Sequence, residues 1–449
     1  NDAPSAIRHE AKRLLVNWIG LPINFCHHDT VERAIAAFAE FSGPRQASLL
    51  GRGDKLDIFK AALINCVSSC IADYDDTHLA TIIHPTGPIA SALLSLCEKE
   101  KVRGSAFLHA LLLGVETQCR LAAALAVAPA KCDGSWFLTG LAGGIGAAIA
   151  AGRLLGLTEQ QMIWAMGIAA SRASGSRETH GTMAKNLVPA WTAEIGLQAA
   201  LLAKQNFTAP DFPLEGKRGL GYLYACKTNF PGMVSRLGEY WEITQNAYKP
   251  FPCGIVMHGA MTGALDIAQK WHPDPKTIRK VSLMVHPLCL DLTGRRSPRN
   301  AVEATFSVYH WVAVALIDRR ISIRQFDDSR VVDPEVLSLR DRVEATVNKE
   351  FARDEALVRI TLEDGRILEQ HVDHALARAY GVTRARQTDP ELRKNGHGRR
   401  PQYQDPEDRP RARGQHHLAR ANVFPAPHQP RTQHHQQRQT ARRRANAFN

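Results

Sequence analysis

An uninterrupted helical pattern runs from residue 8 to about residue 205 of this 449-residue chain. Apolar side chains recur there at spacings of three and four, as in DTVERAIAAFAEF (29–41), GSAFLHALLLGVETQCRLAAALA (104–126) and LAGGIGAAIAAGRLLG (141–156). This spacing predicts α-helices, and apolar residues on most faces of a helix predict burial against other helices. The pattern therefore restricts this part of the chain to an all-α domain.

Four glycines, Gly143, Gly144, Gly146 and Gly152, lie within the third of these predicted helices. They do not form a GxGxxG motif, and no predicted strand precedes them, so they do not indicate a nucleotide site. We interpret them as small residues that let neighbouring helices approach closely.

The pattern changes near residue 250, where YKPFPCG (248–254) interrupts it. Two helices are predicted beyond this point, MHGAMTGALDIAQKW (257–271) and VEATFSVYHWVAVALIDRR (302–320). Strand-like runs follow or separate them: KVSLMVH (280–286), RVEATVN (342–348) and LVRITLEDGRILEQHV (357–372), the last a hairpin with Asp-Gly at its turn. The predicted fold is therefore mainly α, with an all-α domain over 1–252 and a smaller α+β domain over 253–394.

The basic charge of the chain is concentrated at its C-terminal end. Residues 376–449 contain 16 Lys and Arg against 5 Asp and Glu, whereas the first 375 residues carry 40 against 39. The segment 395–449 is rich in Arg, His, Gln and Pro and has few aliphatic residues, which predicts disorder. A nucleic-acid-binding protein is the functional alternative that this segment suggests, but the segment has few aromatic residues for stacking and no recognisable fold, so we do not expect nucleic acid as a partner.

Cysteine usage indicates a reducing, cytoplasmic setting. The nine cysteines are scattered, no CxxC motif occurs, and no Cys/His cluster has the spacing of a zinc or iron–sulfur site. We therefore expect no metal and no organic cofactor. We expect no apolar run to reach the ~18–20 residues of a membrane span and recognise no signal peptide, so no membrane association is expected.

The segment DYDDTHLATIIHPTGP (73–88) is unlike the apolar helices predicted on either side of it. It gathers acids, histidines and threonines between two buried runs, and buried polar groups are costly unless they are paired. Helix capping by Asp and Thr, with His84-Pro85 starting the next helix, is the structural alternative. If the segment continues the preceding helix, Asp73 and Thr77 share one face.

Two further segments contribute candidate residues. Lys185 is predicted to lie in a loop before a helix that starts near Pro189, where backbone N–H groups and the helix dipole favour anions; a surface lysine is the alternative. His258 is predicted in the first turn of the helix after YKPFPCG, and a structural histidine is the alternative.

Asp73, Thr77, His84, Lys185 and His258 together supply a base, an acid, a hydroxyl group and a cation. We expect them to line one pocket suited to removing a proton next to a carboxylate, with Lys185 holding an acidic substrate and a histidine or Asp73 taking the proton. Because neither Lys185 nor His258 lies in an apolar core run, replacing either by Ala is expected to abolish turnover with little loss of stability.

Five ordered motifs give the chain a resemblance to a known family. They are DYDDT…HPTGP (73–88), GRLLGLT (152–158), GTMAK (181–185), FPLEGKRG (212–219) and KPFPC…H (249–258). Over residues 8–394 the chain resembles the MmgE/PrpD family, which includes 2-methylcitrate dehydratases, cis-aconitate decarboxylases and an iminodisuccinate epimerase.

The resemblance implies a catalytic all-α domain, a smaller lid domain, a homodimer, a site between the domains, and no cofactor. It also assigns functional positions to Asp73, Thr77, His84, Lys185 and His258, although the interval from Thr77 to His84 is one residue longer than in cis-aconitate decarboxylases. His310 takes the place of a frequent aromatic residue in the lid and is expected to contact substrate. The segment after residue 394 departs from the family, as a shifted reading frame or an appended tail would.

The sequence thus predicts a cofactor-independent lyase acting on a small di- or tricarboxylate. Dehydration of a 2-methylcitrate-like acid is the leading case, and decarboxylation of a cis-aconitate-like acid and epimerisation of an iminodisuccinate-like acid are the alternatives. All three require a carbanion or enolate next to a carboxylate.

Overall fold

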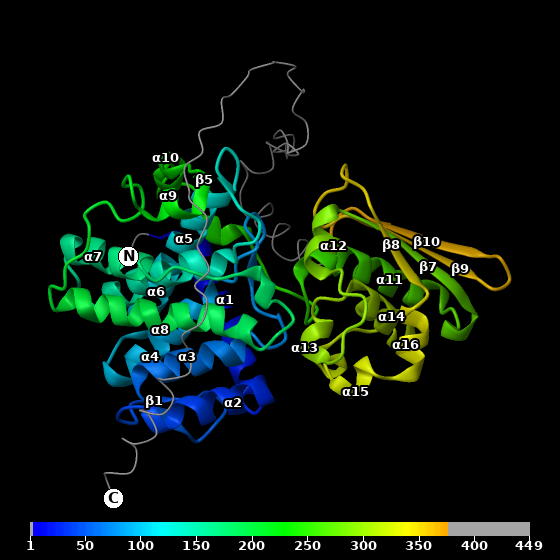
Figure 1. The fold of residues 1–449 in the computed structure, drawn as a ribbon, viewed down its shortest axis with the longest axis horizontal. Coiled ribbons are helices and arrows are strands. Elements are labelled where there is room, and N and C mark those ends of the chain that lie inside the picture. Colours follow the sequence, from blue (N-terminus) through cyan, green and yellow to red (C-terminus); the bar gives the residue numbers. More distant parts are fainter. Residues whose placement is uncertain (1–2, 376–449) are drawn as a thin grey trace, which may run out of the picture. The chain divides into compact units, whose positions relative to one another are not determined.

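The computed structural model describes residues 3–375 of the chain. The predictions for 395–449, and for the last residues of the preceding domain, lie outside the described residues. Figure 1 shows that the described chain is mainly α-helical, with a small sheet formed by its last strands.

The first part of the chain is built from helices. They are α1 (Ser5–Phe25), α2 (Asp29–Phe38), α3 (Ile58–Ser69), α4 (Thr86–Lys99), α5 (Gly104–Ala126), α6 (Leu138–Leu155), α7 (Glu159–Ala170), α8 (Ala184–Lys204), α9 (Leu220–Tyr224) and α10 (Phe230–Val234). Three two-stranded sheets join the loops between them: β1 (Ala47–Ser48) with β2 (Lys55–Leu56), β3 (Thr77–His78) with β6 (Asn246–Ala247), and β4 (Lys131–Cys132) with β5 (Ala225–Lys227).

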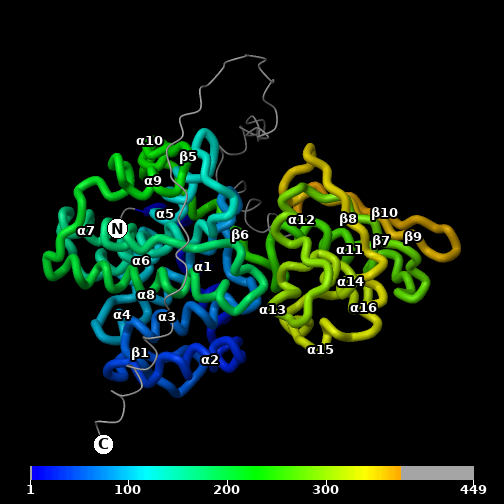
Figure 2. Tube along the Cα trace, in the orientation of Figure 1, coloured from blue at the N-terminus to red at the C-terminus, as the bar shows by residue number. Residues whose placement is uncertain are grey.

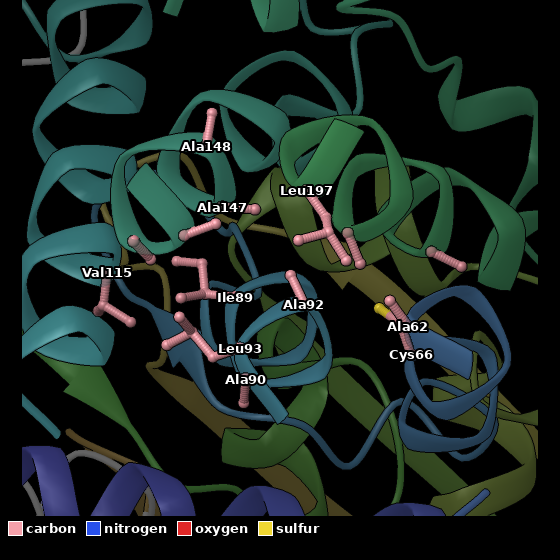
Figure 3. Packing of buried hydrophobic residues seen from close by; sticks show 14 of the residues in the cluster. Ala62, Cys66, Ile89, Ala90, Ala92, Leu93, Val115, Ala147, Ala148 and Leu197 are labelled. Atoms are coloured by element: carbon pink, nitrogen blue, oxygen red, sulfur yellow. The ribbon is translucent and has the colours of Figure 1, made fainter. Parts of the chain in front are cut away.

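Helix α6 lies at the centre of this part and packs against α4, α5, α7 and α8. Figure 3 shows alanines of α6 in the same cluster as Ile89 of α4, Val115 of α5 and Leu197 of α8. Small side chains permit this packing, because a Cβ on Gly146 would stand 2.8 Å from the carbonyl oxygen of Gly114. The prediction that glycines allow close helix approach is confirmed here.

Helix α6 corrects the expectation that no apolar run is long enough to cross a membrane. Its 18 residues have a mean hydropathy of 1.4, which meets that length and composition. However, 83% of the helix is buried inside the protein, as expected for the central helix of a core.

The second part combines helices with a four-stranded sheet. The helices are α11 (His258–Trp271), α12 (Pro287–Thr293), α13 (Ala301–Ala304), α14 (Val308–Asp318), α15 (Asp328–Val331) and α16 (Pro334–Arg340), and the strands are β7 (Ile278–Val285), β8 (Val343–Val347), β9 (Ala356–Leu362) and β10 (Ile367–Val372). The strand order is β10-β9-β7-β8. Only the β7–β8 pair is parallel, with Val281 opposite Val343.

The path of the chain in Figure 2 runs from the helical part through the segment after β6 into this second part. Its buried apolar side chains form a cluster of their own, contributed by α11, α14 and the inner faces of β7 and β9. The hairpin prediction is confirmed, with Gly365 at a φ of 86° in the turn. The helix predicted over 302–320 is divided into α13 and α14, because the Ser307 hydroxyl caps α14 by accepting a hydrogen bond from the N–H of His310.

Candidate functional site

The site is organised around the carboxylate of Asp73, which is 4% exposed. Helix α3 ends at Ser69, and Asp73 follows with a φ of 49°, a left-handed conformation that Asp tolerates better than most residues. Lys185, in the first turn of α8, donates from Nζ to Asp73 Oδ1 at 2.7 Å. Lys249, just after β6, donates from Nζ to Asp73 Oδ2 at 2.8 Å and to the Asp73 carbonyl oxygen at 2.6 Å.

Asp73, Lys185 and Lys249 form a triad whose opposite charges stabilise one another. Burial raises the pKa of Asp73, but the ammonium groups of Lys185 and Lys249 outweigh it and bring the pKa well below its usual range. Burial likewise lowers the pKa of Lys185, and the Asp73 carboxylate more than compensates, so the pKa is raised. Asp73 is therefore an anion and Lys185 a cation throughout the physiological pH range.

His84 presents one ring nitrogen to this triad. Its Nε2 lies 3.8 Å from Asp73 Oδ1. Its Nδ1 lies 3.1 Å from the carbonyl oxygen of Asp76 and 3.2 Å from Thr77 Oγ1. Because the Asp76 carbonyl can only accept, Nδ1 carries the hydrogen, and Nε2 of the neutral ring is left with its lone pair.

Burial lowers the pKa of His84, so the ring is neutral at pH 7. A neutral imidazole with a free Nε2 can accept a proton, and the resulting imidazolium would stand beside the Asp73 carboxylate, which stabilises it. The geometry is that of a general base.

Two more acids of the same segment lie behind His84. Asp75 Oδ1 is 3.6 Å from His84 Nδ1 and 3.9 Å from Lys249 Nζ. Asp76 accepts hydrogen bonds at Oδ2 from Thr86 Oγ1 and Asn246 Nδ2, both at 2.8 Å. Burial raises the pKa of Asp76 to about 7, and the negative charge of Asp75 adds to the effect.

A cavity of about 30 Å³ adjoins the triad. Its lining residues are Asp73, Ile82, His84, Phe137, Arg177, His180, Lys249, Gly254, Ile255, Val256, Leu292, Thr293 and Phe306. The His180 ring lies between Phe137 and Phe306, at centroid distances of 4.9 and 5.0 Å. Burial lowers the pKa of His180 to about 4, so this ring is also neutral.

A larger hollow of about 390 Å³ lies elsewhere, between α1 and Tyr248. It is lined by His9, Lys12, Arg13, Val16, Asn17 and Tyr248 and includes none of the residues around Asp73. We assign the site to the smaller cavity because the perturbed, convergent ionisable groups are there.

The structure brings four of the predicted site residues together: Asp73, Thr77, His84 and Lys185. Of these four residues, Asp73 and His84 line the cavity. Thr77 and Lys185 do not line it but contact His84 and Asp73, respectively. His258 begins α11 as predicted, but it is fully buried against the Phe251 ring and does not line the cavity. Its Nε2–H donates to the carbonyl oxygen of Cys253 at 3.3 Å.

His310 is placed apart from the other predicted residues. It is fully buried on α14, an apolar helix, with its ring against Trp311 and both ring nitrogens unpaired within residues 3–375. It does not line the cavity, so its predicted substrate contact gains no support from the structure.

One local condition is not met, and one local prediction was wrong. Asp73 and Thr77 do not share a helical face, because α3 ends at Ser69 and Thr77 belongs to β3. Lys185 does not lie in a loop: α8 begins at Ala184 and contains Pro189 in its second turn. Pro189 lacks the N–H that would donate to the carbonyl oxygen of Lys185, yet α8 continues through it, so this proline does not mark the start of the helix.

Sequence reasoning missed Lys249, Asp75, Arg177 and His180 as site residues. Lys249 lies inside the quoted KPFPC motif, so its place in a family motif was the available signal. Arg177 and His180 lie just before the quoted GTMAK motif, but nothing in their spacing indicates that they reach the same cavity as Asp73.

Two groups of side chains in the described chain are spaced closely enough to hold a metal ion. Ligand atoms of Asp73, Asp75 and His84 lie within 4.8 Å of one another. However, two ammonium groups already occupy the oxygens of Asp73, so the local charge disfavours a divalent cation. The other group, Glu355, His371 and Asp373, is on the surface and outside the cavity.

Two domains of one known protein family match this chain, one in the helical first part and one in the second part. Residues 1–232 match the MmgE/PrpD N-terminal domain, and residues 251–394 match the MmgE/PrpD C-terminal domain. The chain is 26% identical over 412 residues to cis-aconitate decarboxylase of Aspergillus terreus, covering 84% of this chain and 82% of that protein. It is 28% identical over 299 residues to human cis-aconitate decarboxylase, covering 63% of this chain and 60% of that protein. The chain therefore belongs to the MmgE/PrpD family.

Proposed function

We propose that this protein is a lyase that acts on a small di- or tricarboxylate through an enolate next to a carboxylate. The observation that carries the proposal is the position of His84 Nε2, 3.8 Å from a buried Asp73 carboxylate that holds two lysine ammonium groups. A proton acceptor, a counter-ion for its protonated form, and cations for a developing anion are thereby gathered at one cavity.

The proposed chemistry has a shared intermediate. In a dehydration, His84 Nε2 takes the proton from the carbon next to a carboxylate, and the electron pair passes into that carboxylate. The pair then forms the C=C bond as hydroxide leaves, and the proton held by His84 converts the hydroxide to water. In a decarboxylation, the C–C bond to the departing carboxylate breaks, CO₂ leaves, and the electron pair forms the enolate, which is quenched by a proton that His84 Nε2 takes up from solvent. Both enolates carry additional negative charge, which the ammonium group of Lys249, the lysine that lines the cavity, would stabilise.

Decarboxylation of a cis-aconitate-like acid is supported by the similarity to the cis-aconitate decarboxylases of Aspergillus terreus and human. We propose it as the first reaction to test. Dehydration of a 2-methylcitrate-like acid and epimerisation of an iminodisuccinate-like acid stay predictions of the sequence that the same chemistry allows.

Substrate entry requires the cavity to widen. Its volume of about 30 Å³ holds one or two water molecules. Sites for small organic ligands are typically ~300 Å³ or more. We propose that the wall segments Gly254–Val256 and Leu292–Thr293 move to admit the acid and then exclude water from the enolate.

The test is incubation of the purified protein with a panel of small polycarboxylates, followed by proton NMR in D₂O. We expect one acid to disappear, with CO₂ release or alkene formation identifying the reaction and deuterium marking the carbon that His84 protonates. His84→Gln should abolish the turnover. A folded wild-type protein that transforms none of the acids, with or without added divalent metal, would overturn the proposal.

The homodimer and the cytoplasmic location stay predictions. Sedimentation velocity of the purified chain tests the first, and fractionation of the source cells tests the second.

A further inference from the structure

The reactive cluster has no excess positive charge of its own. Lys185 and Lys249 both pair with the Asp73 carboxylate, and Asp75 lies 3.9 Å from Lys249. Two carboxylates thus face two ammonium groups, while burial keeps His84 neutral. A substrate that brings two or three negative charges therefore needs another cation at this cavity.

Arg177 is that cation. It lines the same cavity as Asp73 and His84. Its Nε donates to the carbonyl oxygen of Trp136 at 3.1 Å, and none of its nitrogens forms an ion pair with a carboxylate among residues 3–375. Burial lowers the pKa of Arg177 and the charge of Asp291 opposes this, and a guanidinium retains its proton at any physiological pH.

The backbone around Arg177 is held by several hydrogen bonds. The N–H of Arg177 donates to the Ser135 carbonyl oxygen at 2.9 Å, and its own carbonyl oxygen accepts from His180 Nδ1 at 2.8 Å. The His180 ring is in turn fixed between Phe137 and Phe306. The guanidinium is therefore attached to a preorganised segment, which reduces the entropy lost when it binds an anion.

We infer that Arg177 determines specificity by binding a second carboxylate of the substrate, remote from the carbon that reacts at His84. This rests on the proposed function and gives the substrate class: acids with at least two carboxylates, in preference to monocarboxylates of the same length. A guanidinium suits this task because its planar N–H groups match a carboxylate in a bidentate arrangement, which the lysines on Asp73 do not offer.

Kinetics with Arg177→Gln and Arg177→Lys test the inference. The substrates are the polycarboxylate that the wild type transforms and the same acid with its remote carboxylate converted to a carboxamide. For the acid we expect Arg177→Gln to raise KM about 10- to 100-fold, the loss typical of a charge-assisted hydrogen bond, with kcat changed much less. For the carboxamide the wild type and Arg177→Gln should have equal KM values, and Arg177→Lys should recover part of the loss.

Arg172→Gln is the matched control, because Arg172 is an exposed arginine five residues earlier that does not line the cavity. It should leave both KM values unchanged. If Arg177→Gln weakened the acid and the carboxamide equally, or lowered kcat alone, Arg177 would not bind the remote carboxylate.

Binding of an unreactive probe separates this inference from the proposed function. Propane-1,2,3-tricarboxylate should bind the wild type at least 10-fold more tightly than Arg177→Gln in a calorimetric titration, and butyrate should not distinguish them. Arg177-dependent binding without turnover of any acid would sink the proposed reaction and keep the inference. Equal binding to both proteins, or none to the wild type, would sink the inference.

Discussion

At the residue scale, Lys185 and Lys249 depend on Asp73 as much as Asp73 depends on them. Both side chains are almost completely buried, and each binds a different oxygen of the same carboxylate. A buried charge that loses its partner costs far more than an exposed one. Lys185 and His258 both lie inside the protein. The expectation that Lys185→Ala and His258→Ala leave stability intact therefore loses its basis.

We now expect Lys249→Met to lower the free energy of unfolding by about 3–5 kcal/mol, because Asp73 keeps a buried charge with one cation fewer. Urea unfolding at pH 7 measures the change. Adding Asp73→Asn to Lys249→Met should restore part of the loss, since the unpaired anion is then removed. An unfolding midpoint for Lys249→Met equal to that of the wild type would show that the pair contributes nothing to stability.

A second prediction concerns the pH dependence of stability through Asp76. Its pKa rises from 3.8 in the unfolded chain to about 7 in the folded protein, so the folded state binds more protons between these values. Stability should therefore fall as pH rises from about 4 to 7, by up to about 4 kcal/mol from this residue. Asp76→Asn keeps an acceptor for Thr86 and Asn246 but cannot ionise.

Urea unfolding of the wild type and Asp76→Asn at pH 5, 6.5 and 8 measures this contribution. As pH rises, Asp76→Asn should become more stable relative to the wild type, and the difference in their free energies of unfolding should become constant above pH 8. Parallel curves for the two proteins would mean that Asp76 is already ionised in the folded state at pH 5.

The chemistry of single residues was predictable where polar groups interrupt buried runs, as Asp73, Thr77 and His84 do. Lys249 escaped because one lysine beside prolines has the same local pattern on a surface as in a core. Its role depends on the meeting of two segments 176 positions apart, which residue type and spacing do not encode. The role of each of these residues in turnover stays a prediction.

At the element scale, the helices of the first part are limited by how closely their backbones approach. Glycines on α6 and α8 leave out the side chains that would separate these two helices; a Cβ on Gly196 would lie 2.4 Å from Ala147 Cβ and 2.7 Å from the Gly144 carbonyl oxygen. Neither neighbour is the flexible end of a side chain, so the backbones themselves would have to move.

We expect Gly196→Ala to lower the free energy of unfolding by about 1–3 kcal/mol through overpacking. Gly20→Ala is the matched control, since Gly20 lies in the interior of α1 with nothing within 4 Å of an added Cβ. That change should instead stabilise the protein by about 0.5–1 kcal/mol, as alanine favours helix over glycine. Thermal unfolding compares the two, and a loss for both or for neither would contradict the packing argument.

The long helices and the β9–β10 hairpin could be predicted because their apolar periods are strong and their turns carry the expected residues. The β3–β6 pair could not, because each strand has two residues and no period of its own. This short pair places the loop that carries Asp73 and His84 beside the segment that carries Lys249. The elements that assemble the site were thus the least visible in the sequence.

At the scale of the whole molecule, buried apolar side chains gather into one large cluster from Ile7 to Ile243 and another from Phe251 to Leu362. The break between the clusters falls close to the change of pattern near residue 250. The boundaries at 252 and 394 stay predictions, since packing within residues 3–375 does not fix them.

The last prediction is that the basic segment 395–449 binds DNA without contributing to catalysis. Residues 395–449 carry 11 Lys and Arg against 3 Asp and Glu, and the family match ends at residue 394. The full chain should bind duplex DNA weakly at low salt through phosphate contacts, and the affinity should fall steeply as salt rises. Removing 395–449 should abolish that binding and leave kcat/KM for the acid unchanged, because every residue around Asp73 precedes the deletion. Filter binding at 50 and 200 mM salt, with turnover assayed on the same two proteins, measures both effects.

Retained DNA binding after the deletion would place the basic surface within the first 394 residues. A loss of turnover would show instead that the segment contributes to the active protein.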